Sequence, residues 1–329
     1  MMEIKRFQNV FTEGKCDYCD SNTLVLHRRY SGESLCSECF QERIEKKIYK
    51  TISKYNLLKP EDKIIVGLSG GKDSISLLYN LYKIQKRTYN SKPIIALSID
   101  EGIQHYRANC LEAANHFCSK YNIKHHIISF KEIVGKPLDE IVKNSKQTAN
   151  PRYACYYCAL IRRRLLNDHA KKLGGDVLAL GHNLTDIAET FLMNVLFKRF
   201  YLIANQYIFK HHSSETDKYF IKKIMPLMKI PEEEITIYAN LKEFHYYKSH
   251  CPFRKTEPIV RKRVLDFIES FKQLSPEIEF NLFNGFMELS EILYNTQEKK
   301  DSDYCKKCGY PSGDNEYCSY CSFIRTLEN

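Results

Sequence analysis

The stretch Ser69-Gly70-Gly71-Lys72-Asp73-Ser74 decides the fold of this chain. It follows the apolar run from Ile64 to Leu68 and precedes the apolar residues Ile75 and Leu77. This order predicts a buried strand, a glycine turn and the start of a helix. Paired glycines let the backbone approach an anion, and the first amides of a helix point their positive dipole end toward it. With the charge of Lys72, the stretch predicts a phosphate-binding loop.

This loop differs from the common nucleoside-triphosphate loop, in which a glycine, four residues and a second glycine precede the lysine, and Ser or Thr follows it. Here Val66 occupies the first glycine position, and Asp73 follows the lysine. The pattern S-G-G-x-D-S resembles the pyrophosphate loop of the adenylating ATP pyrophosphatases. The resemblance implies that ATP is cleaved at its α-phosphorus to make an adenylate. The alternative is a turn that only caps a helix, which needs none of the flanking Ser, Lys and Asp residues.

Strand and helix patterns alternate on both sides of this loop. Apolar runs predict strands at Lys63 to Leu68, Pro93 to Ile99, Lys124 to Ser129 and Val177 to Leu180. Helical periodicity fills Ser74 to Gln85, Tyr106 to Tyr121, Tyr157 to Leu173 and Thr185 to Phe200. We therefore predict an α/β fold with a doubly wound parallel sheet. Ligands of such sheets bind beyond the carboxyl ends of the strands, where the loop, Ser98 and Gly181-His182-Asn183 fall.

The 329 residues suit a nucleotide-binding core with smaller additions. We predict an N-terminal zinc module with a connecting helix over residues 1–50 and a catalytic domain over 51–265. A helical linker over 266–300 and a C-terminal zinc ribbon over 301–329 complete the chain. Further helices are predicted at Glu38 to Tyr55, Pro231 to Phe244, Glu257 to Phe271 and Phe280 to Tyr294.

Composition favours a cytoplasmic protein without a membrane partner. No run of about 18 apolar residues occurs, and Met1 to Arg6 lacks the apolar core of a signal peptide. Thiols stay reduced in the cytosol, so thirteen cysteines point to metal sites or reactive thiols.

Eight of the cysteines form two sets with zinc-ligand spacing. Two C-x-x-C pairs sixteen residues apart make the first set, and two pairs nine residues apart make the second: Cys16, Cys19, Cys36 and Cys39, then Cys305, Cys308, Cys318 and Cys321. Two such pairs can close a tetrahedron around Zn²⁺. Two disulfides per set are the alternative, which a reducing compartment disfavours. Closed sites of this kind stabilise structure and carry out no chemistry.

A third set comprises Cys155, Cys158 and Cys251. Three thiolates could hold an iron–sulfur cubane and leave its fourth iron open to a substrate or to sulfide. The C-x-x-C spacing is shared by zinc, redox and cluster sites, so a redox dithiol and a persulfide-carrying thiol stay open as alternatives. Cys110 and Cys118, eight apart in a helical segment, are predicted to be buried packing residues.

The net charge of +10 is concentrated in one region. The segment from Glu140 to Leu265 contains 22 Lys and Arg against 12 Asp and Glu. Its net charge of +10 equals the net charge of the whole chain. This predicts a polyanionic partner, with Tyr153, Tyr156, Tyr157 and Phe253 available to stack on bases. The alternative, a set of solvated helix faces, explains any single basic pair but not their concentration.

The whole chain resembles the cytosolic tRNA 2-thiolation enzymes of the TtuA and NcsA types. The TtcA type is a more distant relative and lacks the terminal zinc modules. Four features carry the resemblance: Ser69 to Ser74; Cys155 and Cys158 followed by Arg162-Arg163-Arg164; Gly181-His182-Asn183 with Asp186, Ala188 and Thr190; and Cys251-Pro252.

The resemblance implies a role for each matching residue. ATP would be bound by Gly67, Leu68, Ser69, Gly70, Gly71, Lys72, Asp73, Ser74, Ser98 and Gly181. Asp73 would also position Mg²⁺, and Asp186 would be the acidic residue of the catalytic centre. Cys155, Cys158 and Cys251 would bind a [4Fe-4S] cluster.

Two departures from the family pattern affect these roles. Thr185 replaces the first of two acids that often follow G-H-N-x, which leaves Asp186. Arg162 stands where TtuA types carry a lysine. Arginine keeps its proton, so it can neutralise phosphate charge but does not act as a base.

The implied reaction activates a uridine C2 oxygen as an adenylate and exchanges it for sulfide carried by the cluster. The wobble uridine is the favoured target and the T-loop uridine the alternative. Sulfide or a thiocarboxylated ubiquitin-like carrier would donate sulfur, and the family implies a homodimer. Adenylating amide or amine ligases need no central cysteine trio. A non-catalytic zinc-ribbon RNA-binding protein would leave Asp73 and the strand-end glycines unexplained.

Overall fold

The computed structural model describes residues 11–146, 152–208, 218–253, 260–296 and 303–328. The predicted helix start at Glu257 and the segment from Met1 to Arg6 lie outside these residues. Within the described residues, no helix is both long enough and apolar enough to cross a membrane.

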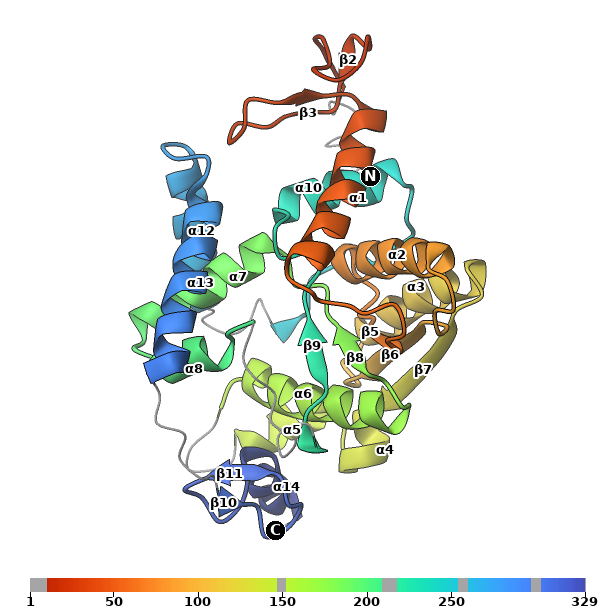
Figure 1. The fold of residues 1–329 in the computed structure, drawn as a ribbon. Coiled ribbons are helices and arrows are strands. Elements are labelled where there is room, and N and C mark those ends of the chain that lie inside the picture. Colours follow the sequence, from red (N-terminus) through yellow and green to blue (C-terminus); the bar gives the residue numbers. More distant parts are fainter. Residues whose placement is uncertain (1–10, 147–151, 209–217, 254–259, 297–302, 329) are drawn as a thin grey trace.

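Five parallel strands form the central sheet in the order β7-β6-β5-β8-β9 (Figure 1). They are β5 (Ile64–Gly67), β6 (Ile95–Asp100), β7 (Lys124–Ser129), β8 (Val177–Ala179) and β9 (Lys222–Ile224). Ile65 is in register with Ile95 on one side and with Leu178 on the other. The chain runs outward from β5 to β7 and returns to β8, so the strand order reverses between β5 and β8. Ligands bind at such a switch point.

Helices cover both faces of the sheet, which confirms the predicted doubly wound fold. On one face, Ile64 and Val66 share an apolar cluster with α1 (Ser37–Lys54), α2 (Lys72–Arg87), α3 (Arg107–Lys120) and α10 (Glu232–Leu241). On the other face, Ile65 and Leu178 pack with α6 (Ala154–Lys172). The alternation follows from the strand period of two, which sends successive side chains to opposite faces.

Several elements differ from the prediction. Strand β9 was missed because it has three residues, two of them lysines, and only Ile224 is buried. The helix predicted from Thr185 to Phe200 ends earlier, as α7 (Leu184–Leu196), and a separate helix α8 (Phe200–Asn205) begins where the prediction ended. Lys198 lies between them with a φ of +52°, which an α-helix does not accommodate. Short helices α4 (Phe130–Val134) and α5 (Leu138–Ser145) connect β7 to α6 and were also missed.

The two cysteine-rich ends lie at opposite ends of the molecule (Figure 1). The N-terminal module pairs β1 (Thr12–Glu13) with β2 (Thr23–Leu24) and β3 (Leu26–His27) with β4 (Ser34–Leu35). Helix α1 then crosses residue 50 into the core. Helices α12 (Val260–Lys272) and α13 (Ile278–Thr296) pack beside α7, and α12 crosses residue 265. The C-terminal module comprises β10 (Asp303–Tyr304), β11 (Pro311–Gly313) and α14 (Ser319–Glu328), next to α6.

Candidate active site and metal centres

The phosphate loop joins β5 to α2 and depends on Gly70. Its φ is +86°, and a Cβ there would lie 1.9 Å from the carbonyl oxygen of Cys110. The Ser69 and Ser74 hydroxyls lie 3.0 Å apart, and Ser74 donates to the Gly71 carbonyl at 3.0 Å. Gly71 provides no side-chain cap for α2. The loop is therefore held by its serines, while the amino end of α2 offers backbone amides to an anion.

Gly181 brings the end of β8 against this loop. A Cβ at Gly181 would lie 3.0 Å from the backbone nitrogen of Ser74 and 3.2 Å from the carbonyl carbon of Asp73. A Cβ at Gly67 would similarly lie 2.9 Å from Leu180. The contacts at Gly181 are with backbone atoms of Ser74 and Asp73, which cannot shift easily. The two sides of the switch point are thus in direct contact.

Charged side chains gather where the loop meets α7 and α10. Lys72 Nζ lies 2.9 Å from Asp73 and 2.6 Å from Glu232. Asn183 donates to Asp73 at 3.1 Å and forms a capping box with Asp186 at the start of α7. Burial raises the pKa of Asp73, and the Asp186 carboxylate adds to this effect while Lys72 opposes it. A divalent cation with oxygen ligands would relieve the repulsion between these two carboxylates.

A buried ion-pair chain connects the phosphate loop to α6. Arg107 donates to the carbonyl of Ser69 at 2.7 Å and pairs with Glu101 at 2.8 Å. Glu101 also pairs with Arg162 of α6 at 3.4 Å. The Glu101 and Arg107 side chains are 5% and 7% exposed, whereas Arg162 is 47% exposed. Arg162 is therefore anchored at Glu101 and still reaches the surface.

The third cysteine set lies at the other end of this chain of contacts. Cys155 and Cys158 occupy the first turns of α6, which begins three residues before the predicted start. Cys158 and Cys251 pack against one apolar cluster with Tyr157, and the charges of Cys155 and Cys251 both act on Cys158. Burial raises the pKa of Cys158 to about 12, and Arg162 acts in the opposite direction. In the segment leading to Cys251, Tyr247 donates its backbone N–H to Gly70 at 3.1 Å.

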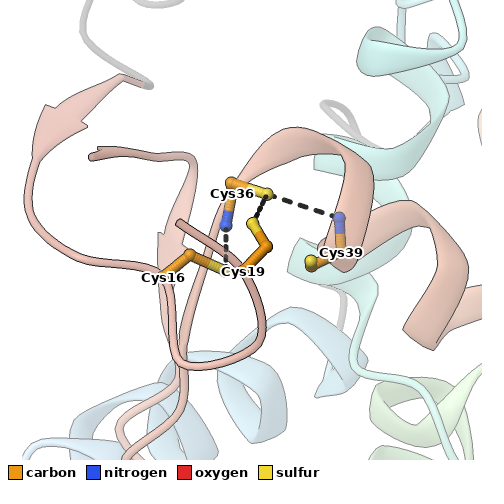
Figure 2. A group of neighbouring side chains, drawn as sticks. All are labelled: Cys16, Cys19, Cys36 and Cys39. Carbon is orange, nitrogen blue, oxygen red and sulfur yellow. Dashed lines mark hydrogen bonds between the residues drawn. The ribbon is translucent and has the colours of Figure 1, made fainter. Parts of the chain in front are cut away.

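The other eight cysteines form two compact clusters. In each, the four sulfurs lie within 4.8 Å of one another. In the N-terminal cluster Cys19 and Cys36 Sγ are 3.5 Å apart, and the backbone N–H of Cys39 donates to Cys36 Sγ (Figure 2). Four thiolates around one Zn²⁺ stand about 3.8 Å apart, since each Zn–S bond is about 2.3 Å. Among the described residues, Cys155, Cys158 and Cys251 are not a group whose sulfurs all lie within 4.8 Å of one another.

A family model described as a PP-loop domain matches residues 40–265. A probable sulfurtransferase of Methanocaldococcus jannaschii is 34% identical, with 98% of this chain and 91% of that protein covered. Cytoplasmic tRNA 2-thiolation protein 1 of Debaryomyces hansenii is 30% identical, with coverages of 95% and 88%. The solved U34-tRNA thiolase NcsA of Methanococcus maripaludis, with its [4Fe-4S] cluster, superposes with a TM-score of 0.79. Its identity is 35%, and 95% of this chain and 96% of that chain are covered.

The chain belongs to the NcsA-type tRNA 2-thiolation proteins of the PP-loop family. The sequence resemblance is thereby confirmed. In this NcsA-type protein Ser98 is fully buried, and its hydroxyl donates to the Leu68 carbonyl at 2.6 Å and lies 2.7 Å from His125. The Ser98 hydroxyl is therefore engaged within the protein, and a contact of Ser98 with ATP stays a prediction. Thr185 is also engaged, since it accepts the backbone N–H of Glu232 at 3.0 Å.

The sequence predicted no role for Glu101, Arg107, Asn183 or Glu232 of this NcsA-type site, although it placed Asn183 at the ligand-binding edge of the sheet. The spacing of Asn183 and Asp186 is that of a capping box, so this pair could have been found. Arg107 and Glu101 follow the end of β6, but no local pattern relates them to Arg162. Glu232 meets Lys72 across 160 positions of sequence.

Proposed function

We propose that this chain replaces the C2 oxygen of a tRNA uridine with sulfur in two stages. In the first, the C2 oxygen attacks the α-phosphorus of ATP, a C–O–P linkage forms and pyrophosphate leaves. In the second, sulfide forms a bond to C2 and AMP leaves with the former C2 oxygen. The buried chain from Ser69 through Arg107 and Glu101 to Arg162 carries this proposal, because it couples the phosphate loop to the cysteine-bearing helix.

The first stage uses the residues around the phosphate loop. The amides of Gly71 and the first turn of α2, together with Lys72, hold the β- and γ-phosphates, and Glu232 gives up Lys72 when ATP enters. Asp73 and Asp186 hold Mg²⁺. The half-exposed Arg162 neutralises charge that develops at the α-phosphate, and as an arginine it does so without moving a proton.

The second stage uses the cysteine trio. Cys155, Cys158 and Cys251 hold a [4Fe-4S] cluster, which supplies an open iron site for sulfide when bound. The cluster in the solved relative supports this assignment, as does the packing of Cys158 and Cys251 against one apolar cluster. Arg162 lies one helical turn after Cys158, so the arginine that neutralises the phosphate also acts on the Cys158 thiol. Each of the two four-cysteine clusters holds one structural Zn²⁺ ion.

The surface beside Cys155 suits a splayed tRNA base. Tyr153 and Tyr156 are 57% and 48% exposed, and the Arg152 guanidinium lies 5.7 Å from the Tyr156 ring centroid. Arg162 and Arg163 are exposed on α6. Aromatic rings stack on unpaired bases and arginines bind phosphates, so the target uridine leaves its stack to enter here. The relative named as a U34-tRNA thiolase supports the wobble uridine as the target.

The proposal extends to the surroundings of the enzyme. The name of the cytoplasmic relatives supports a cytoplasmic location. Sulfur arrives either as free sulfide or from a thiocarboxylated ubiquitin-like carrier, and the enzyme works as a homodimer. Size-exclusion chromatography with light scattering, and thiolation assays with each sulfur source, test these two statements.

Anaerobic purification followed by iron, sulfide and nucleoside analysis tests the proposal. Wild type is expected to hold four irons and to form AMP, pyrophosphate and 2-thiouridine with tRNA. Cys251→Ala is expected to lose iron and thiolation, whereas Cys118→Ala, a buried cysteine in α3, keeps both. A cluster-free wild type that still thiolates tRNA would replace the cluster stage with a cysteine persulfide. Failure to form AMP with any tRNA would refute the first stage.

A further inference from the structure

The C-terminal four-cysteine module packs directly on the helix that carries Cys155 and Cys158. Helix α14 contacts α6, and Figure 1 shows the module beside α6. Phe323 of α14 stacks against Tyr157, which lies between the two cysteines, with ring centroids 5.0 Å apart. Both side chains are at most 9% exposed. An aromatic pair of this kind stabilises the contact beyond the area that it buries.

A polar contact follows farther along the same helix. Arg164 of α6 stacks over the ring of Tyr310, 3.5 Å from its centroid, and donates to Cys308 Sγ at 3.5 Å. Asp168 fixes the guanidinium at 2.6 Å and accepts the hydroxyl of Tyr310. Arg164 thus touches a predicted zinc ligand and lies two positions after Arg162. Groups that donate to a metal ligand orient it and tune its metal affinity.

The N-terminal module has a different neighbour. Its Arg28 pairs with Glu234 of α10 at 2.7 Å, and both side chains are at most 5% exposed. Glu234 also accepts the hydroxyl of Tyr30. The two four-cysteine modules therefore rest on opposite parts of the core, so the N-terminal one is an internal control for the other.

We propose that the C-terminal four-cysteine module positions the cysteine helix, and that Arg164 is the positioning residue that links the two. With metal bound, the module holds Phe323 and Cys308 against α6 and so keeps Cys155, Cys158 and Arg162 in place. Without metal, the short β10-β11 hairpin and α14 lose their closing cross-link, because small modules with four cysteine ligands fold through their metal. Zinc occupancy at one end of the chain then controls iron–sulfur loading in the centre. The control of iron loading rests on the proposed function, whereas the positioning of α6 by the module does not.

Hydrogen–deuterium exchange on cluster-free, full-length protein tests the positioning itself. We compare Cys321→Ser in the C-terminal module with Cys39→Ser in the N-terminal one, and count zinc in both. Cys321→Ser is expected to speed amide exchange in residues 154–165 about tenfold and to leave residues 64–81 at the wild-type rate. Cys39→Ser is expected to leave both segments unchanged. Unchanged exchange in 154–165 for Cys321→Ser, or equal acceleration in both segments, would overturn the proposal.

Iron analysis after anaerobic reconstitution adds a second readout. Cys321→Ser is expected to retain about a tenth of wild-type iron, with ATP affinity within about twofold of wild type. Arg164→Gln keeps all thirteen cysteines and is expected to hold both zincs but less iron than wild type. Arg164→Lys is expected not to restore the iron content, because lysine cannot both stack on Tyr310 and donate to Cys308. An Arg164→Gln protein with wild-type exchange and iron would refute the role of Arg164. A wild-type protein without iron would refute the cluster assignment. The exchange experiment would still decide whether the module positions α6.

Discussion

Replacing Glu101 with glutamine removes a negative charge from between two arginines. Glu101 pairs with Arg107 at 2.8 Å and with Arg162 at 3.4 Å, and its side chain is 5% exposed. Arg107 is 7% exposed and would keep the carbonyls of Ser69 and Ile99 as neutral partners but lose its ion pair. Breaking a buried pair costs about 3–5 kcal/mol, because the remaining charge is uncompensated. Since the glutamine oxygen still accepts one hydrogen bond, we expect a loss near the lower figure.

The same change is expected to slow adenylation. Arg107 holds the Ser69 carbonyl, so a displaced Arg107 loosens the phosphate loop, and we expect kcat/KM for AMP formation to fall at least about tenfold. Urea unfolding followed by circular dichroism measures the first effect and pyrophosphate release the second. Asp266→Asn is the control: its pair with Lys262 is about 60% exposed on both sides and should contribute less than about 1 kcal/mol. Both expectations would be refuted by a Glu101→Gln protein whose free energy of unfolding lies within about 1 kcal/mol of wild type and whose rate of AMP formation is unchanged.

Three further predictions concern single side chains. Gly70→Ala should abolish ATP binding, since its Cβ would meet a carbonyl oxygen at 1.9 Å; Gly135→Ala has a similar φ of +83° with open space and should bind ATP normally, and equal affinities would contradict this. Burial lowers the pKa of His125 to about 4, so the folded protein keeps it neutral while the unfolded chain takes up a proton near pH 6.5. The stability it provides is complete above that pH and should fall by about 1–2 kcal/mol from pH 7 to pH 5 in urea unfolding, allowing for partial exposure; the same loss in His125→Gln would disprove the assignment. Glu232→Gln frees the loop lysine and should lower KM for ATP up to about fivefold, whereas the adjacent Glu233→Gln should leave it unchanged. A raised KM in Glu232→Gln would show that this carboxylate assists ATP.

The elements that carry the phosphate loop could be predicted because their signals are local. Buried strands β5 and β8 consist of consecutive apolar residues, and the loop requires glycine where the backbone is crowded. The two four-cysteine clusters follow from spacing alone, since each C-x-x-C pair occupies one turn. Strand β9 escaped prediction because backbone pairing with β8, and not its own side chains, makes it a strand.

The connection between the two halves of the site could not be predicted. Glu101 and Arg162 are 61 positions apart, and Lys72 and Glu232 are 160 apart. Glu101 pairs with Arg162 because α6 packs against β6, and the C-terminal module contacts α6 although Arg164 and Cys308 are 144 positions apart. The sequence by itself determined which chemistry is present: a loop for phosphates, thiols for metal and a basic surface. The tertiary structure decided which of these groups act on one another, because buried charges interact through space and local sequence patterns do not record those distances.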